Sequence, residues 1–259
     1  MKNVTPPNPY ETKDLLDQYL LFHYGEKKDI FPYSFCPEEV FNFHARCVSE
    51  LMEGCAKKSS SRALDIGCAV GRCSFELARY VPYVLGLDMS SRFIDQAKVI
   101  KEKGACRVSC KVEGDICEEI EIVIPDDIDR GRVEFQVGDA CCLSPGLGIF
   151  DRILLVNLID RVKDPLSCLS QLKNFVNPKA RVLVVSPYTW SEEFTPKSSW
   201  LGGFVQNEKP FWTSAAIEHI LGPNFIRIKT LNIPFLIREH ARKFQLGISE
   251  AALWEFKGN

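Results

Sequence analysis

The sequence has no apolar run near the roughly 20 residues that a membrane-spanning helix needs. It also lacks an excess of charge of either sign, since 32 Lys and Arg face 34 Asp and Glu, giving a net charge of −2. The first nine residues have no apolar core, so we expect no secretory signal. The composition therefore excludes a basic nucleic-acid-binding protein and predicts a cytoplasmic protein with no nucleic-acid or membrane partner.

Histidine is scarce, with four residues, whereas cysteine is abundant, with an odd total of eleven. An odd number of cysteines in a chain of this size does not indicate a disulfide framework. Cys106 and Cys110 are spaced too widely for a two-residue metal clip, and Cys141 directly precedes Cys142. We expect reduced thiols that mostly act as small apolar side chains, and no metal site.

What the chain does have is enough apolar sequence for a sizeable core, since 46% of its 259 residues are hydrophobic. Apolar residues at three- and four-residue spacing predict a helix from Tyr10 to Gly25 and a second that Pro37 opens and Gly54 closes. We expect residues 1–9 to be a tail, 1–61 to form a tail plus helical cap, and 62–259 to form one compact domain.

After residue 61, short apolar strands alternate with helices. Strands are predicted at 62–66, 83–87, 132–137, 152–157, 181–186, 225–231 and 251–256. Helices are predicted at 72–80, at about 91–103, from 165 to the Asn177-Pro178 pair and from 213 to the Gly222-Pro223 pair. This alternation predicts an α/β fold, Rossmann-like, with a seven-stranded mostly parallel sheet and helices on both faces.

Three later segments are additional to this alternation of strands and helices. Residues 104–131 alternate and predict an inserted hairpin, and residues 187–212 are aromatic and rich in Gly and Pro. Residues 232–250 are long for a connection between two strands. We expect these insertions and the N-terminal cap to lie over the active site.

The sharpest local signal is the segment Leu64-Asp-Ile-Gly-Cys-Ala-Val-Gly71, in which a strand runs into a glycine-containing turn and then a helix. Glycine there permits a tight turn and close approach of a ligand. Asp88 ends the second strand 21 residues after Gly67, the spacing at which a carboxylate meets ribose hydroxyls. Asp139, after the third strand, is placed to accept from an adenine amino group.

The same segment argues against two other nucleotide sites. Its spacing, Gly67-Cys-Ala-Val-Gly71, is not that of the G-x-G-x-x-G turn that seats a pyrophosphate, and it lacks the Lys and Ser/Thr of a P-loop. A tight strand–helix corner without any ligand is the structural alternative.

These residues resemble the first motif of class I S-adenosylmethionine-dependent methyltransferases, with Ala69 where many members have a glycine. The resemblance implies that S-adenosylmethionine is the cofactor and that its methionine part, ribose and adenine meet the first, second and third strand ends. The implied cofactor-binding residues are Asp65, Gly67, Cys68, Ala69, Gly71, Arg72, Asp88, Met89, Asp139, Ala140, Asn157, Leu158 and, in the cap, Tyr33.

Longer stretches resemble a narrower family, the 4-mercaptohistidine (5-thiohistidine) N-methyltransferases of ovothiol biosynthesis. They are residues 19–25, 157–161, 186–190, 193–196, 200–204 and 234–244. The resemblance implies methylation of an imidazole ring nitrogen of 5-thiohistidine to give ovothiol A. It also implies that a separate sulfoxide synthase acts upstream, because no second catalytic domain is recognisable here.

Such a substrate brings a carboxylate, an ammonium group, a sulfur and an imidazole. We expect Asn157, Asp160 or Tyr188 to fix the ring tautomer or take its proton, and arginines to bind the carboxylate. The expected substrate-binding residues are Arg161, Tyr188, Trp190, Glu193, Trp200, Arg238, Glu239 and Arg242. Each has a structural alternative: turn capping for Asn157 and Asp160, lid packing for the tryptophans, and a surface pair on a short helix for residues 238–242.

Other functions remain open at this point. They are methylation of another small molecule, such as a histidine-like compound, a thiol or arsenite, methylation of a protein or nucleic acid, and a non-catalytic cofactor-binding module. The absence of an Asn-Pro-Pro-aromatic run after Val156 counts against DNA amino methylation. The intact set of Gly67, Gly71 and Asp88 counts against a non-catalytic module.

Overall fold

A computed structural model describes residues 9–35, 37–55 and 60–258. The predicted tail, apart from Pro9, and residues 56–59 near the end of the predicted helical cap lie outside the described residues. Within them, no helix is long and apolar enough to cross a membrane.

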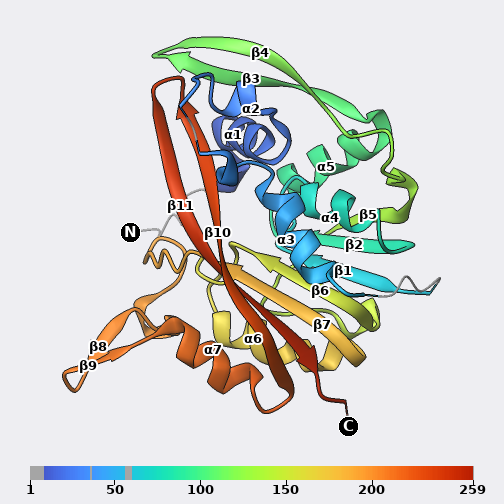
Figure 1. Ribbon diagram of the computed structural model, residues 1–259, viewed down its shortest axis with the longest axis vertical. Coiled ribbons are helices and arrows are strands. Elements are labelled where there is room, and N and C mark those ends of the chain that lie inside the picture. Colours follow the sequence, from blue (N-terminus) through green and yellow to red (C-terminus); the bar gives the residue numbers. More distant parts are fainter. Residues whose placement is uncertain (1–8, 36, 56–59, 259) are drawn as a thin grey trace, which may run out of the picture.

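The centre of the molecule is a seven-stranded sheet in the order β10-β11-β7-β6-β1-β2-β5 (Figure 1). Strand β11 pairs antiparallel with β7 and β10, and the remaining pairs are parallel. This confirms the predicted Rossmann-like α/β fold. The strands are β1 (Arg62–Ile66), β2 (Tyr83–Asp88), β5 (Val133–Val137), β6 (Phe150–Val156), β7 (Val176–Ser186), β10 (Phe225–His240) and β11 (Lys243–Phe256).

Helices cover both faces of this sheet, and each face has its own apolar cluster. One cluster packs α3 (Phe43–Met52), α4 (Arg72–Leu77) and α5 (Ser91–Lys103) on the sheet. The other packs α6 (Pro165–Ser170), a 3₁₀ turn (Gln171–Phe175) and α7 (Thr213–Leu221). Strand side chains alternate between the two: Leu64 and Ile66 face the second cluster and Ala63 the first.

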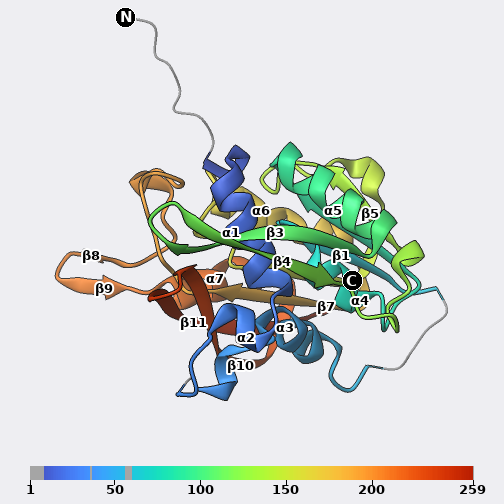
Figure 2. The same cartoon turned by 90° about the horizontal axis from the view of Figure 1, so that it is seen from above.

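Accessory elements gather beyond the carboxyl ends of the parallel strands (Figures 1 and 2). They are a 3₁₀ turn (Pro9–Glu11), α1 (Lys13–Tyr24), α2 (Lys27–Ile30) and the inserted hairpin β3 (Ala105–Glu113) with β4 (Ile116–Val123). The insertion was predicted as a hairpin, and this is confirmed. The cap belongs to the same core as the sheet, because Leu20 and Leu51 pack in one cluster with Leu154.

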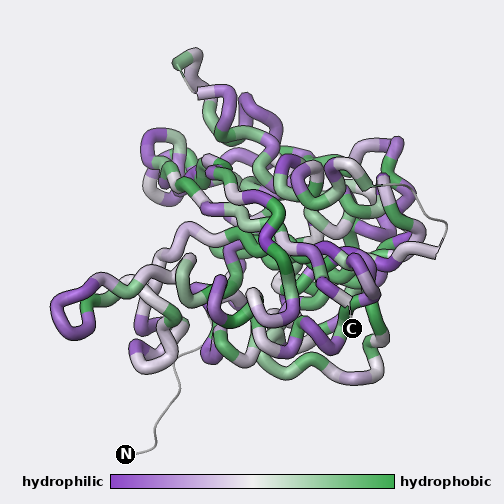
Figure 3. Tube along the Cα trace, turned by 60° about the horizontal axis from the view of Figure 1, so that its bottom comes forward, coloured by the Kyte–Doolittle hydropathy of each residue, from purple (hydrophilic) through white to green (hydrophobic). Residues whose placement is uncertain are grey.

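The prediction for residues 232–250 is wrong. They form no loop and no short helix, but continue β10 and β11 into a long antiparallel hairpin that turns between His240 and Lys243. The alternation of Phe244, Leu246 and Ile248 was the available signal. A second projection, β8 (Phe204–Gln206) with β9 (Lys209–Phe211), extends from the 187–212 segment and is hydrophilic at its tip (Figure 3).

Several predicted helix bounds also need correction. The first helix begins at Lys13, capped by the Thr12 side chain, rather than at Tyr10. Pro37 precedes a 3₁₀ turn (Glu38–Val40), and α3 begins only at Phe43. Helix α4 ends at Leu77, three residues short of the prediction, and α6 passes into a 3₁₀ turn after Ser170.

Candidate active site

The loop after β1 is fastened to the end of β2 by its backbone. The N–H groups of Gly67 and Cys68 both donate to the Leu87 carbonyl, at 2.7 and 2.9 Å. The Ala69 N–H donates to Asp88 Oδ2 at 2.9 Å, and the Ser90 N–H donates to Asp88 Oδ1 at the same distance. Asp88 therefore fixes both the glycine-containing loop and the start of α5.

Three residues of this loop have left-handed backbone: Gly67 (φ 74°), Ala69 (φ 47°) and Gly71 (φ 90°). A Cβ on Gly67 would lie 2.6 Å from Leu158 Cδ1, so a larger residue there would force the Leu158 side chain to move. Ala69 adopts this conformation with a side chain, which is unfavourable for an L-residue. The hydrogen bond from its N–H to Asp88 helps to hold it.

The strand ends fit the expected S-adenosylmethionine. Each oxygen of Asp88 accepts one backbone N–H, and a carboxylate has further lone pairs for ribose hydroxyls. Burial raises the pKa of Asp88, while its backbone hydrogen bonds oppose that shift. Asp139 is exposed after β5 and accepts from the Cys141 N–H at 2.8 Å, and its carboxylate retains further acceptor positions. Their chemistry supports the ribose and adenine assignments, which stay predictions.

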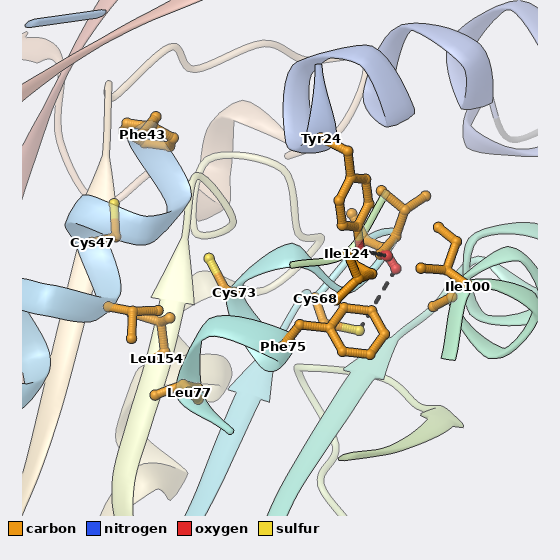
Figure 4. Close-up of a cluster of buried hydrophobic side chains, with 14 of the residues drawn as sticks. Tyr24, Phe43, Cys47, Cys68, Cys73, Phe75, Leu77, Ile100, Ile124 and Leu154 are labelled. Atoms are coloured by element: carbon orange, nitrogen blue, oxygen red, sulfur yellow. Dashed lines mark hydrogen bonds between the residues drawn. The ribbon is translucent and has the colours of Figure 1, made fainter. Parts of the chain in front are cut away.

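The N-terminal segment covers this edge. Tyr10 packs against Phe93 and Phe194, and Tyr19 lies 4.9 Å from Phe93 between ring centroids. The Tyr24 hydroxyl donates to the Val70 carbonyl at 2.6 Å, so α1 touches the glycine-containing loop itself. Figure 4 shows the Tyr24 side chain directed from α1 toward Cys68 and Phe75.

Other predicted cofactor residues also make contacts within the fold. The Asp65 carboxylate, 1% exposed, accepts from the Ser74 hydroxyl at 2.6 Å, and burial raises its pKa to about 7. Arg72 pairs with Glu76, while Cys68 is buried, with burial raising the pKa of its thiol. At the same edge, Met89 is exposed, Leu158 is half-buried, and the buried Ala140 accepts from Gln171 through its carbonyl.

Tyr33 is placed differently from the prediction. Its hydroxyl donates to the Ala241 carbonyl at 3.0 Å, and its ring packs with Phe31, Phe35 and Phe244. These contacts bind it to the turn of the β10–β11 hairpin rather than to the loop after β1. The aromatic residues of the cap that do reach the cofactor edge are Tyr10, Tyr19 and Tyr24.

A polar network continues from β6 toward β11. Asp160, fully buried, accepts from the Ser186 hydroxyl and from the Thr189 N–H, both at 3.0 Å. Asn157 Oδ1 accepts from the Ser249 hydroxyl at 2.8 Å, and the Tyr188 hydroxyl donates to Glu250 Oε1 at 2.6 Å. The three predicted catalytic residues are thus brought to one region. Asp160 fixes the turn after β7, which is a structural contact.

The aromatic segment 187–212 borders this network. Trp190 and Trp200 stack at 6.0 Å between centroids, and their ring N–H groups donate to Thr213 Oγ1 and the Thr195 carbonyl. Arg161 lies over the Phe194 ring at 4.7 Å and 3.9 Å from Asp160. Glu193 is exposed. The tryptophan contacts accord with lid packing, and Arg161 is the cation nearest the network among the predicted substrate-binding arginines.

Arg238, Glu239 and Arg242 do not join the other predicted substrate residues. In the β10–β11 hairpin, Arg238 lies opposite Phe244, and Ile233 lies opposite Ser249. Arg238 is therefore five residues along β10 from the position of Ser249, a distance of about 16 Å. Arg238 is 7% exposed and donates to the carbonyls of Asp29 and Lys111. An amino acid whose ring lies beside Asn157 is too short to reach it, so this prediction is corrected.

Arg238, Glu239 and Arg242 lie around a different part of the molecule, at the far end of the β10–β11 hairpin. Arg238 and Glu239 line a separate cavity of about 590 Å³ between α1, the β3–β4 hairpin and β10. Glu239 forms an ion pair with Lys243, and Arg242 is exposed at the turn.

Sequence reasoning missed Ser249 and Glu250, because they lie in a segment predicted as a connection. Only the pairing of β11 with β7, Glu250 opposite Ser186, brings them to the active-site edge. The alternation of Phe244, Leu246 and Ile248 would have indicated a strand. It would not have indicated which strands lie on either side of it.

The fold and this edge define a nucleotide-type cofactor site in a Rossmann-like protein. The chain matches the model of a family described as a methyltransferase domain over residues 38–232. It therefore belongs to the methyltransferase-domain family.

Individual relatives agree with this family. The magnesium-protoporphyrin O-methyltransferase of Rhodobacter capsulatus is 27% identical over 185 residues, 69% of either chain. The N-methyltransferase NodS of Bradyrhizobium japonicum, solved with S-adenosyl-L-homocysteine, has a TM-score of 0.55 at 12% identity and covers 95% of this chain and 98% of its own. A SAM-dependent methyltransferase of Methanosarcina mazei gives 0.53 at 16% identity, covering 78% and 95%. At these identities the two structures establish a shared fold.

Proposed function

We propose that the protein is an S-adenosylmethionine-dependent methyltransferase that methylates an imidazole ring nitrogen of 5-thiohistidine. S-adenosylmethionine is the cofactor, and when bound it supplies a methyl group on a sulfonium sulfur for in-line transfer to a nucleophile. The chain's own residues position the two reactants, which is where most of the rate enhancement of such a displacement arises.

One observation supports this acceptor above others. The segments 157–161, 186–190 and 193–196, on which the resemblance to thiohistidine methyltransferases rests, meet at the carboxyl end of β6. Asp160 joins the first to the second through Ser186 and Thr189, and Arg161 joins the first to the third over Phe194. The family-like residues therefore gather at the strand end where we expect the methyl acceptor to lie.

The chemistry of these groups matches the acceptor. Arg161 has a side chain 29% exposed and supplies a cation for the substrate carboxylate. Asn157 and Tyr188 supply hydrogen-bonding groups for the ring, and the stacked Trp190 and Trp200 limit water access. Glu193, exposed in the same segment, is a candidate partner for the ammonium group. The thiohistidine itself is the product of an oxidative sulfur-insertion activity.

Product mass spectrometry on the purified protein tests the proposal. Reactions contain S-adenosylmethionine with 5-thiohistidine, with histidine, or with no acceptor, and cofactor binding is measured in parallel by calorimetry. We expect a product that is heavier than the acceptor by one CH₂ group and that forms only with thiohistidine. NMR then assigns the methylated ring nitrogen. Tight cofactor binding without any product would contradict the acceptor, and methylation of histidine at equal rate would contradict the selectivity.

A further inference from the structure

Two non-glycine residues at the ends of neighbouring strands have left-handed backbone. Asn157 follows β6 with φ 50°, and Tyr188 follows β7 with φ 54°. This conformation is tolerated by asparagine but is a genuine outlier for a bulky residue such as tyrosine. Such outliers persist where the surrounding structure determines them, and they concentrate at active sites.

Consecutive residues of β11 hold both side chains. The Ser249 hydroxyl donates to Asn157 Oδ1 at 2.8 Å, and Glu250 Oε1 accepts from the Tyr188 hydroxyl at 2.6 Å. The sheet does not need these contacts, because the backbone ladder already pairs Glu250 with Ser186 and Asn232. What they fix is the position of two polar groups beside the end of β6.

The Glu250 carboxylate has hydrogen-bond acceptor positions that no protein donor fills among the described residues. Among the described residues, the Tyr188 hydroxyl is the only side chain that donates to it, and no cation lies within ion-pair distance of it. A half-buried carboxylate with one donor retains several acceptor positions. Because successive side chains of a strand point to opposite faces, Glu250 lies on the same face as Tyr188 and can accept an N–H from a ring that lies beside Tyr188.

We propose that Glu250 accepts the ring proton in the methyl transfer and that Tyr188 is the positioning residue that orients it; this rests on the proposed function. The ring N–H proton passes to Glu250 and leaves an imidazole lone pair. The nitrogen on which that lone pair resides forms the N–CH₃ bond as the S–CH₃ bond breaks. The bonding electron pair stays on sulfur, giving S-adenosylhomocysteine, and Glu250 later loses its proton to water.

The charged groups around this pair set its pH behaviour. Burial, followed by the hydrogen bond to Glu250 on β11, raises the pKa of the Tyr188 hydroxyl, and Asp160 after β6 and Arg227 on β10 are further charges that act on it. Tyr188 thus remains protonated and donates to the carboxylate. This donation stabilises the ionised carboxylate of Glu250, and its removal therefore makes that form less favourable.

The test compares the full-length wild type with Glu250→Gln, Tyr188→Phe and a matched control, Glu255→Gln, which lies on the same strand and pairs with Arg181. Methyl transfer to 5-thiohistidine is measured from pH 5.5 to 9, with cofactor affinity by calorimetry and folding by thermal unfolding. Glu250→Gln should lower kcat by about 100-fold or more, leave cofactor Kd within about threefold, and remove the acidic limb of the kcat/KM profile.

Tyr188→Phe should keep more activity and shift the acidic limb to higher pH, and Glu250→Asp should restore part of kcat. The control should match the wild type. If the wild type is active and Glu250→Gln keeps its rate and its acidic limb, Glu250 is not the proton acceptor while the proposed function stands. If the wild type binds cofactor but does not methylate thiohistidine, both proposals fail together.

Discussion

The carboxylate of Asp88, at the end of β2, accepts a hydrogen bond from the backbone N–H of Ala69, in the loop after β1. One residue thus shapes the glycine-containing loop and presents the acid expected to bind ribose. Its second oxygen holds the Ser90 N–H, which precedes α5. Loop geometry and cofactor affinity should therefore depend on the same side chain.

Asp88→Ala should weaken binding of S-adenosylhomocysteine by about 2–3 kcal/mol, roughly a 30- to 150-fold rise in Kd, because it removes charge-assisted hydrogen bonds. Calorimetry on the folded variant measures the effect. Asp95→Ala is the control, since Asp95 is exposed on α5. Unchanged affinity in Asp88→Ala would contradict the ribose assignment.

Arg238→Ala should act on stability and leave the acceptor KM unchanged. The Arg238 guanidinium joins α2 to β3 through two backbone carbonyls and is almost fully buried. Loss of these bonds should lower the free energy of unfolding by about 2–3 kcal/mol. Urea unfolding and steady-state kinetics separate the two effects, with the exposed Arg242→Ala as control. A large rise in KM without a stability change would return Arg238 to the substrate site.

Asp88 and Arg238 show which parts of the site could be predicted from the sequence and which could not. Asp88 was predictable because a strand, a glycine-containing turn and a 21-residue spacing are all local features. Arg238 was misplaced because its neighbours depend on how far a hairpin extends, which is a matter of strand pairing between distant segments. The order of strands around β1 followed from the alternating pattern, whereas the contribution of Glu250 required the register of β11 on β7.

Residue identity alone was also insufficient within the site. Asp160 and Tyr188 were equally plausible proton acceptors in the sequence. In the structure Asp160 is fully buried and accepts hydrogen bonds from Ser186 and Thr189. Tyr188 donates to the carboxylate of Glu250, which the sequence analysis did not identify.

Gly67→Ala should be destabilising for two separable reasons. Left-handed backbone costs an L-residue about 1–2 kcal/mol, and the new Cβ would meet Leu158 Cδ1 at 2.6 Å. Leu158→Ala removes only the second cause. A double-mutant cycle by urea unfolding should therefore show favourable coupling of about 1 kcal/mol or more. Additive effects would mean that the Leu158 side chain moves aside without cost.

The buried His44 and the half-buried His23, whose Nδ1 atom is buried, should make the protein sensitive to acid. The rings of His23, on α1, and His44, on α3, lie 3.8 Å apart between centroids, and Arg72 is close to both. Burial, followed by the Arg72 charge, lowers the pKa of His23 to about 3, and burial, followed by His23, lowers the pKa of His44. Both rings are therefore neutral in the folded protein at neutral pH.

The sign of the effect follows from linkage. Because the unfolded chain binds these protons near pH 6.5 and the folded chain does not, the stability is fully present above about pH 6.5. It is lost as the pH falls toward 3, by about 1.4 kcal/mol per pH unit for each histidine. Asp65, whose pKa burial raises to about 7, acts in the opposite direction, since its protonation favours the folded state as the pH falls.

His44→Phe isolates the histidine contribution, because it keeps an aromatic ring among Phe22, Phe43 and His23 and leaves Asp65 in place. Urea unfolding at pH 4.5 to 6 should show a slope of stability against pH smaller than that of the wild type by about 1.4 kcal/mol per pH unit. His219→Phe, at an exposed position of α7, should leave the slope unchanged. An equal slope in His44→Phe and the wild type would mean that His44 becomes protonated inside the folded protein, so that this pair of histidines does not limit acid stability.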